Sequence, residues 1–204
     1  MMPLPTIQVW DRLVRIGHWS LVIAFAVAYL TEDEALETHE WAGYAVATYI
    51  VVRGVWGFIG TEHARFSDFL FSPFKALAYL VDLVRMRAPR YIGHSPAGAM
   101  MVFALLFMLA GTTVTGIAEL ALSHGEGPLA LVLEQTATQS TNTTVEWGES
   151  RPQHEESAMK ELHELFANLT LILIALHVGG VIVASIAHKE SLVLAMITGL
   201  KRSP

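Results

Sequence analysis

The histidines are the residues of this sequence whose number and spacing could support chemistry. There are nine of them and no cysteine, so a metal centre in this chain has to use imidazole, thioether or carboxylate ligands. His163 and His177 stand 14 residues apart. On a helix this separation is about 21 Å along the axis and about 40° short of four full turns. The two imidazoles would therefore face the same way at two heights of one helix.

Each of these histidines has a possible partner at the start of another apolar segment. His18 opens the first segment and His39 opens the second, and successive spanning helices run in opposite directions. His18 is thus expected at the depth of His177, and His39 at the depth of His163. Two imidazole pairs at two depths are what two bis-histidine haems require, with neutral ring nitrogens on opposite sides of each iron. Because covalent C-x-x-C-H attachment needs cysteine, the pattern predicts two non-covalent haems b, one inner and one outer.

Three further residues are expected to contact these haems. Arg53 follows His39 by 14 residues, so it shares that helix face and would end near the inner haem. Arg15 stands three residues before His18, on the same side of its helix. A buried guanidinium needs an anion, and a haem propionate would serve. Gly43 lies one turn after His39 and would let a flat ring approach the backbone, although small residues also serve helix packing.

The other candidates have a plainer interpretation. A single histidine at a helix end is usually an interfacial residue, and His39 and His163 taken one at a time fit that description. A histidine in mid-span, such as His177, is a functional candidate by default. The methionines are interpreted as packing residues. Five histidines in loops or at helix ends are not expected to bind a cofactor: His63, His94, His124, His154 and His188.

Long apolar segments must position these histidines. The chain has 204 residues, of which 53% are hydrophobic and only 16% charged, against about 25% charge in a typical soluble domain. A bilayer core needs about 20 mostly apolar helical residues. The sequence predicts an all-α fold, an integral membrane four-helix bundle that forms a single domain over residues 1–204. Its spans are expected at 13–30, 39–59, 97–122 and 162–187, the first interpreted as a retained helix and not a secretory signal.

The segments between the spans indicate the orientation. With both termini in the cytoplasm, 11 of the 13 Lys and Arg residues fall on the inner side, where such residues are enriched. Residues 67–87 are amphipathic but too charged to span, which predicts a helix on the inner membrane surface among anionic lipid headgroups. The polar outer segment 123–159 is either functional or disordered. The net charge of -6 argues against binding to nucleic acid.

Four stretches of the sequence resemble the bacterial cytochrome b561 family and, within it, the cytochrome b subunits of nickel–iron hydrogenases. They are VWDRLVRIGHWSL, HEWAGYAVATYIVVRGVWG, RYIGHSPAGA and HELFANLTLILIALHVGG. The resemblance covers nearly the whole chain except the outer loop. It implies four transmembrane helices in the bacterial inner membrane, electron exchange with the quinone pool, and two haems b. The haem ligands of that family match His18, His39, His163 and His177.

The function expected from these features is electron transfer between membrane quinone and an outer, periplasmic redox partner, such as a cytochrome c or a hydrogenase. Two alternatives stay open at this point. One is a self-sufficient superoxide:quinone oxidoreductase, which the acidic first outer loop disfavours because superoxide is an anion. The other is a haem-free metal transporter that uses the same histidines. Whether the chain is an enzyme or a subunit of one does not follow from the sequence.

Overall fold

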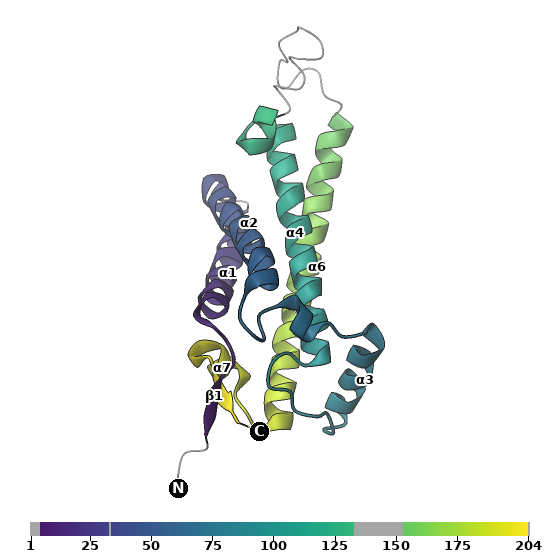
Figure 1. Cartoon of the computed structure of the whole chain (residues 1–204). Coiled ribbons are helices and arrows are strands. Elements are labelled where there is room, and N and C mark those ends of the chain that lie inside the picture. The colour runs from purple at the N-terminus through teal and green to yellow at the C-terminus, as the bar shows by residue number, and fades with distance from the viewer. Residues whose placement is uncertain (1–4, 33, 133–152, 204) are drawn as a thin grey trace. The chain divides into compact units, whose positions relative to one another are not determined.

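The structure is a computed structural model that describes residues 5–32, 34–132 and 153–203, with the backbone alone at 153–157, and most of the described residues are helical. Figure 1 shows the course of the chain. In chain order the elements are β1 (Thr6–Gln8), α1 (Arg12–Leu30), α2 (Leu36–Ile59), the 3-10 helix η1 (Phe66–Phe69), α3 (Pro73–Val84), α4 (Pro96–Ser123), α6 (Gln153–His188), α7 (Leu192–Thr198) and β2 (Leu200–Arg202).

The predicted all-α membrane fold is confirmed. Four helices within the described residues are long and apolar enough to cross a membrane, namely α1, α2, α4 and residues Ala158–His188 of α6. Three of them begin and end within a few residues of the predicted spans. The fourth candidate span, Ala158–His188, begins four residues before the predicted 162–187, and its helix α6 extends further, to Gln153. Its first turns are rich in Glu, Ala, Met and Lys, strong helix formers that extend the helix beyond the apolar run.

The chain divides into two compact units, Met1–Leu106 with Leu171–Pro204 and Phe107–Thr170. In the first unit, α1 packs against α2. Asp11 joins the two helices, because its Oδ1 accepts from the Val14 amide at 2.8 Å while its Oδ2 accepts from Trp56 Nε1 at 2.9 Å and Thr61 Oγ1 at 2.6 Å. Burial raises the pKa of Asp11, but these hydrogen bonds outweigh it and lower the pKa. That the units form one domain stays a prediction.

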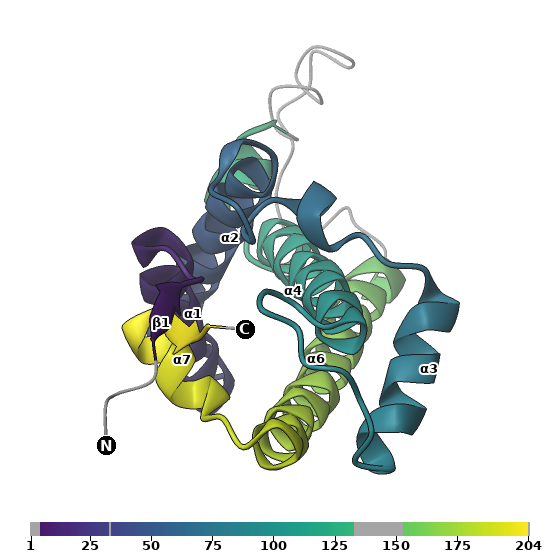
Figure 2. The ribbon, with the colours of Figure 1, turned by 60° about the horizontal axis from the view of Figure 1, so that its bottom comes forward.

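Both ends of the first unit meet in a small sheet that the sequence did not predict. β1 pairs antiparallel with β2, with Ile7 opposite Lys201, and β1 lies beside α7 in both ribbon views (Figures 1 and 2). Gly199 makes this possible, because it ends α7 with a positive φ of 84°, which glycine adopts at little cost. Its carbonyl accepts from the amides of Val9 and Trp10 at 2.8 and 3.2 Å.

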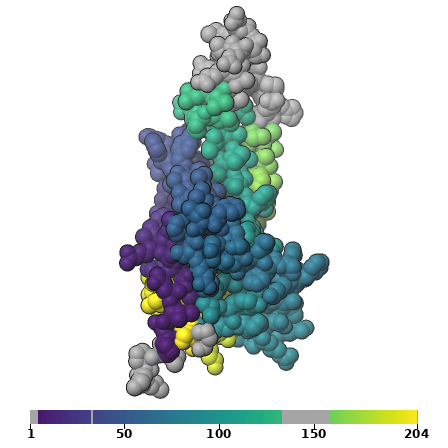
Figure 3. Space-filling model, in the orientation of Figure 1, coloured from purple at the N-terminus to yellow at the C-terminus, as the bar shows by residue number. Residues whose placement is uncertain are grey.

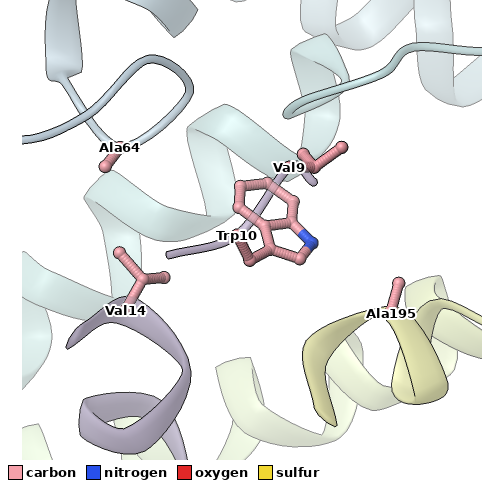
Figure 4. Close-up of a cluster of buried hydrophobic side chains, with 5 residues drawn as sticks. All are labelled: Val9, Trp10, Val14, Ala64 and Ala195. Carbon is pink, nitrogen blue, oxygen red and sulfur yellow. The ribbon is translucent and has the colours of Figure 1, made fainter. Parts of the chain in front are cut away.

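Apolar side chains from three distant segments of the chain pack into one buried cluster. The cluster consists of Val9, Trp10, Val14, Ala64 and Ala195 (Figure 4). Its members precede α1, begin α1, follow α2 and lie in α7. The cluster therefore fixes the end of the α1–α2 pair to the C-terminal segment.

Ion pairs and buried hydrogen bonds hold the C-terminal segment in place. Arg90 forms two bonds with Glu190, from Nε at 3.1 Å and from Nη2 at 3.0 Å, and Glu190 also accepts from the Arg202 amide at 3.0 Å. Lys201 is buried, and its Nζ donates to the carbonyls of Tyr91 and Ile92. We call this set of contacts the C-terminal clasp.

Helix α3 lies within the segment predicted to be amphipathic. Ala76, Tyr79 and Leu83 are its buried residues, while Phe74 and Val84 are about four-fifths exposed, at 85% and 78%. Figure 3 shows α3 at the surface of the first unit. Two features of the sequence interpretation are not settled by this structure. The location of α3 on the membrane surface stays a prediction, and the centre of the outer segment, 133–152, lies outside the described residues.

Candidate haem site

Two of the four predicted ligands face each other in the first unit. His18 lies in the second turn of α1 and His177 in the second half of α6. Their ring centres are 6.5 Å apart and the ring planes are inclined by 54°. The sequence placed these two imidazoles at one depth, and the structure brings them together.

This spacing fits a metal ion between the two rings. An imidazole nitrogen lies about 2 Å from a bound first-row metal such as zinc and about 1.1 Å from its own ring centre, which gives roughly 6.3 Å between the centres of two opposed rings. Among the described residues there is no group of three or more His, Asp or Glu that could hold a metal. Two protein ligands suffice when a porphyrin supplies the other four positions, so His18 and His177 fit a haem.

The outer candidate in the first unit is His39, at the start of α2. Its Nδ1 lies 2.8 Å from the carbonyl oxygen of Ala28. A carbonyl only accepts, so Nδ1 carries the hydrogen and Nε2 carries the lone pair, the tautomer that bonds metals. Gly43, one turn later, has nothing within 4 Å of the position that a Cβ would occupy. No described atom therefore fills the position beside Gly43, where the sequence predicted that a flat ring approaches the backbone.

His163 has the same arrangement in the second unit. Its Nδ1 lies 2.9 Å from the carbonyl oxygen of Thr112, which again leaves the lone pair on Nε2. Gly116 lets the ring approach α4, because a Cβ there would lie 2.9 Å from His163 Cε1. His39 and His163 belong to different units, and their pairing on one iron stays a prediction.

Neither arginine has an acidic side chain as a hydrogen-bond partner among the described residues. Arg15 donates from Nη2 to the Ile197 carbonyl at the end of α7. Arg53 is 4% exposed, and its Nη2 donates to the Ala64 carbonyl at 3.1 Å. Arg15 Nε and Arg53 Nη1 are buried and have no hydrogen-bond partner among the residues that the structure describes. Their predicted contact with propionates is not tested by these positions.

The structure draws attention to one histidine that sequence reasoning set aside. The ring of His94 packs against Phe69 at 4.2 Å and Trp10 at 4.7 Å between ring centres. Its Nδ1 is buried and has no hydrogen-bond partner among the described residues. Burial above all, with the charges of Arg53, Lys201 and His63, lowers the pKa of His94 to about 3. Nothing in a loop sequence such as GHSP signals such burial.

Comparison with known proteins identifies the family of this chain. Residues 9–199 match the model of the prokaryotic cytochrome b561 family. A probable Ni/Fe-hydrogenase B-type cytochrome subunit from Bradyrhizobium diazoefficiens is 26% identical over 153 residues, which are 60% of each chain. The chain thus covers about three-fifths of the length of that relative. No solved structure matches this chain.

The match spans all four candidate membrane helices and the four predicted ligands. A haem b cofactor, electron transfer and a multi-pass membrane location follow from the family. The chain belongs to the prokaryotic cytochrome b561 family and is a transmembrane b-type cytochrome of electron transfer.

Proposed function

We propose that the chain holds two haems b and conducts electrons between the membrane quinone pool and a redox protein on the outer side. The inner haem is bound by His18 and His177, and the outer haem by His39 and His163. The observation that carries the proposal is the opposed pair His18–His177, whose 6.5 Å ring spacing accepts one iron. The second pair is supported by the Nδ1 contacts of its members, which leave Nε2 as the metal-binding nitrogen.

Haem iron supplies the one-electron chemistry, and the protein sets where and how readily it occurs. The imidazoles fix the two positions along the electron path. Arg15 and Arg53 place positive charge toward the inner end of that path, where propionates are the expected counter-ions. A buried guanidinium nitrogen without a partner, such as Nη1 of Arg53, favours an anionic ligand beside it.

The topology proposed from loop charge puts both termini in the cytoplasm of a bacterial cell and the chain in its inner membrane. The α1–α2 connection then lies outside. Its described acidic residues Glu32, Glu34 and Glu37 are exposed, so a soluble outer partner would present a basic surface. The relative from Bradyrhizobium is named as a hydrogenase subunit, which supports a hydrogenase as that partner, and a cytochrome c satisfies the same charge requirement.

Two other functions considered from the sequence are less well supported. Superoxide is an anion, and the acidic α1–α2 connection would repel it. The haem-free transporter is set aside because the chain belongs to a cytochrome family.

The proposal is tested with the purified protein in liposomes that contain a quinol and an outside electron acceptor. We expect quinol to reduce the haems and the acceptor to reoxidise them, and His177→Ala to abolish this transfer. Transfer that persists at the wild-type rate in His177→Ala would contradict the proposal. The rate with a basic soluble acceptor should fall as salt rises, because salt screens charge attraction.

A further inference from the structure

A buried pair of unsatisfied polar groups is linked through the Arg53–Phe66, Phe66–Phe69 and Phe69–His94 contacts. Its two members are Arg53 Nη1 and His94 Nδ1, both buried and without a hydrogen-bond partner among the described residues. A buried polar atom left unpaired is costly. Such a pair therefore needs either a ligand or another explanation.

The helix contacts place Arg53 relative to His18. Asp11 of the α1 cap bonds Trp56 of α2, and a Cβ at Gly17 would lie 2.9 Å from the Tyr49 ring. The two helices therefore run antiparallel, with Tyr49 level with Gly17 and His18. Arg53 follows Tyr49 by four residues, which puts it about 6 Å along α2 toward the Asp11 end. Arg53 therefore lies about one helical turn from the level of His18.

The cluster has unmatched positive charge and flat apolar walls. The guanidinium of Arg53 lies over the Phe66 ring at 4.8 Å. Asp11 is the carboxylate that acts electrostatically on Arg53, but its oxygens accept from Val14, Trp56 and Thr61 instead. Nothing described near Arg53 supplies an anion for its second nitrogen. The chemical group that would satisfy the second guanidinium nitrogen of Arg53 is a carboxylate.

His94 stands at the same cluster and has the properties of a second contact. Its ring is fixed between Phe69 and Trp10, and the Arg53 charge acts on it. Burial above all, and then the charges of Arg53, Lys201 and His63, lower the pKa of His94 to about 3, against a hydrogen bond with the His63 backbone that raises it. A carboxylate beside Nδ1 would favour the protonated ring, which can donate to it.

We propose that His94, together with Arg53, binds the propionate groups of the haem held between His18 and His177. Haem b carries two such carboxylates, and the cluster offers two unpaired nitrogens. This inference rests on the proposed inner haem but adds a residue from the loop before α4. It makes His94 a positioning residue. A hydrogen bond from His94 and the charge of Arg53 would both offset the negative propionates, which raises the reduction potential of that haem.

The test is a redox titration of the purified holoprotein and its variants. Arg53→Gln should lower the reduction equilibrium constant of one haem about tenfold, the effect of one unit charge at about 12 Å with an effective dielectric constant near 20. His94→Gln should lower it in the same direction by a smaller factor, because it removes a hydrogen bond and no unit charge. The matched control is His124→Gln, an exposed histidine after α4, which should change neither haem. Wild-type potentials in His94→Gln would overturn the inference.

A second experiment separates a propionate contact from a general loss of structure. The wild-type protein and His94→Gln are reconstituted with haem dimethyl ester, which lacks the carboxylates. The difference between their potentials should disappear, and a difference that persists would overturn the inference.

A third measurement does not depend on the folding of a variant. Solid-state NMR of the reduced wild-type protein, with 13C-carboxyl haem and 15N-histidine, should show a histidine nitrogen within hydrogen-bond distance of a propionate. Absence of that contact would overturn the inference. A wild-type protein that binds no haem at all would instead refute the proposed function.

Discussion

The proposed outer and inner haem ligands are held in different ways. His39 and His163 each direct Nδ1 at a backbone carbonyl, of Ala28 at 2.8 Å and of Thr112 at 2.9 Å. His18 has no such support, because its Nδ1 is buried without a hydrogen-bond partner in the described part of the chain. Its ring is oriented by packing, edge-on to Trp19 at 5.3 Å between ring centres. The proposed outer ligands His39 and His163 are thus oriented by hydrogen bonds, whereas His18 is oriented by packing against neighbouring side chains.

This difference bears on redox chemistry. A hydrogen bond from Nδ1 to a carbonyl raises the basicity of the ligating imidazole, which favours ferric iron. The inner site lacks this contact at His18 and has Arg53 nearby, whose charge favours ferrous iron. In the proposed arrangement of two haems, these two environments would push the two reduction potentials apart.

Removal of a ligand should have the largest effect. His177→Ala removes one of the two imidazoles of the inner site, so we expect the haem content to fall by about half while the outer haem remains. The pyridine haemochrome assay, normalised to protein, measures this. His124→Ala is the control and should keep the full content. Unchanged pigment in His177→Ala would mean that His177 binds no haem.

Crowding the proposed outer ligand His163 should have the next largest effect on the bound haem. In Gly116→Ala the new Cβ would lie 2.9 Å from His163 Cε1, closer than such atoms normally approach, so the ring must shift away from Thr112. We expect partial loss or a spectral shift of the outer haem with the inner haem unchanged. Gly54→Ala is the matched control, because a Cβ at Gly54 meets nothing within 4 Å. A wild-type spectrum in Gly116→Ala would show that His163 is not held as described.

The two proposed haems should also differ in reduction potential in the wild-type protein. We expect the inner haem to have the higher reduction potential, so that electrons pass downhill from the outer haem to the inner one. A redox titration of wild-type protein and of His177→Ala assigns the two potentials. If His177→Ala loses the haem with the lower reduction potential, the hydrogen bonds of His39 and His163 and the charge of Arg53 do not determine which haem has the higher potential.

The smallest effect is expected at the C-terminal clasp. Burial raises the pKa of Glu190, but bonds from Arg90 and from the Arg202 amide outweigh it and lower the pKa. A lowered pKa means that the stabilisation is present above the ordinary value of 4.5 and is lost as the pH falls through the folded value. Glu190→Gln should cost about 1–3 kcal/mol at pH 7.

Thermal unfolding of wild-type and Glu190→Gln protein in detergent, at pH 7 and below pH 4, measures this cost. The gap between the two midpoints should narrow at the lower pH. A gap of equal size at both would assign the loss to packing and not to the charged glutamate.

The fold was predictable because lipid imposes a simple rule on sequence. Residues 13–30 and 97–122 are apolar over the length that a bilayer requires, and the observed α1 and α4 differ from them by one residue at most at each end. The start of α6 followed a different rule, the helix propensity of polar residues outside lipid. The three-residue strands β1 and β2 lack any local pattern, since their pairing joins opposite ends of the chain.

The site was predictable to the extent that helical spacing determines it. The fourteen-residue spacing of His163 and His177 predicts that they share a helix face and differ in depth. The position of His18 at the head of the first span then predicts that it lies opposite His177. The burial of His94 does not follow, because it depends on how a loop packs against Trp10 and Phe69. The Nδ1 contacts of His39 and His163 also involve backbone carbonyls, which no residue type reveals.

The number of haems in the wild-type protein tests the central claim most directly. Haem and protein are quantified in the same purified sample, and the oxidised sample is examined by electron paramagnetic resonance. We predict two haems b per chain, both with the low-spin signal of two axial imidazoles. One haem per chain, or a high-spin signal from either, would contradict the assignment of the four histidines.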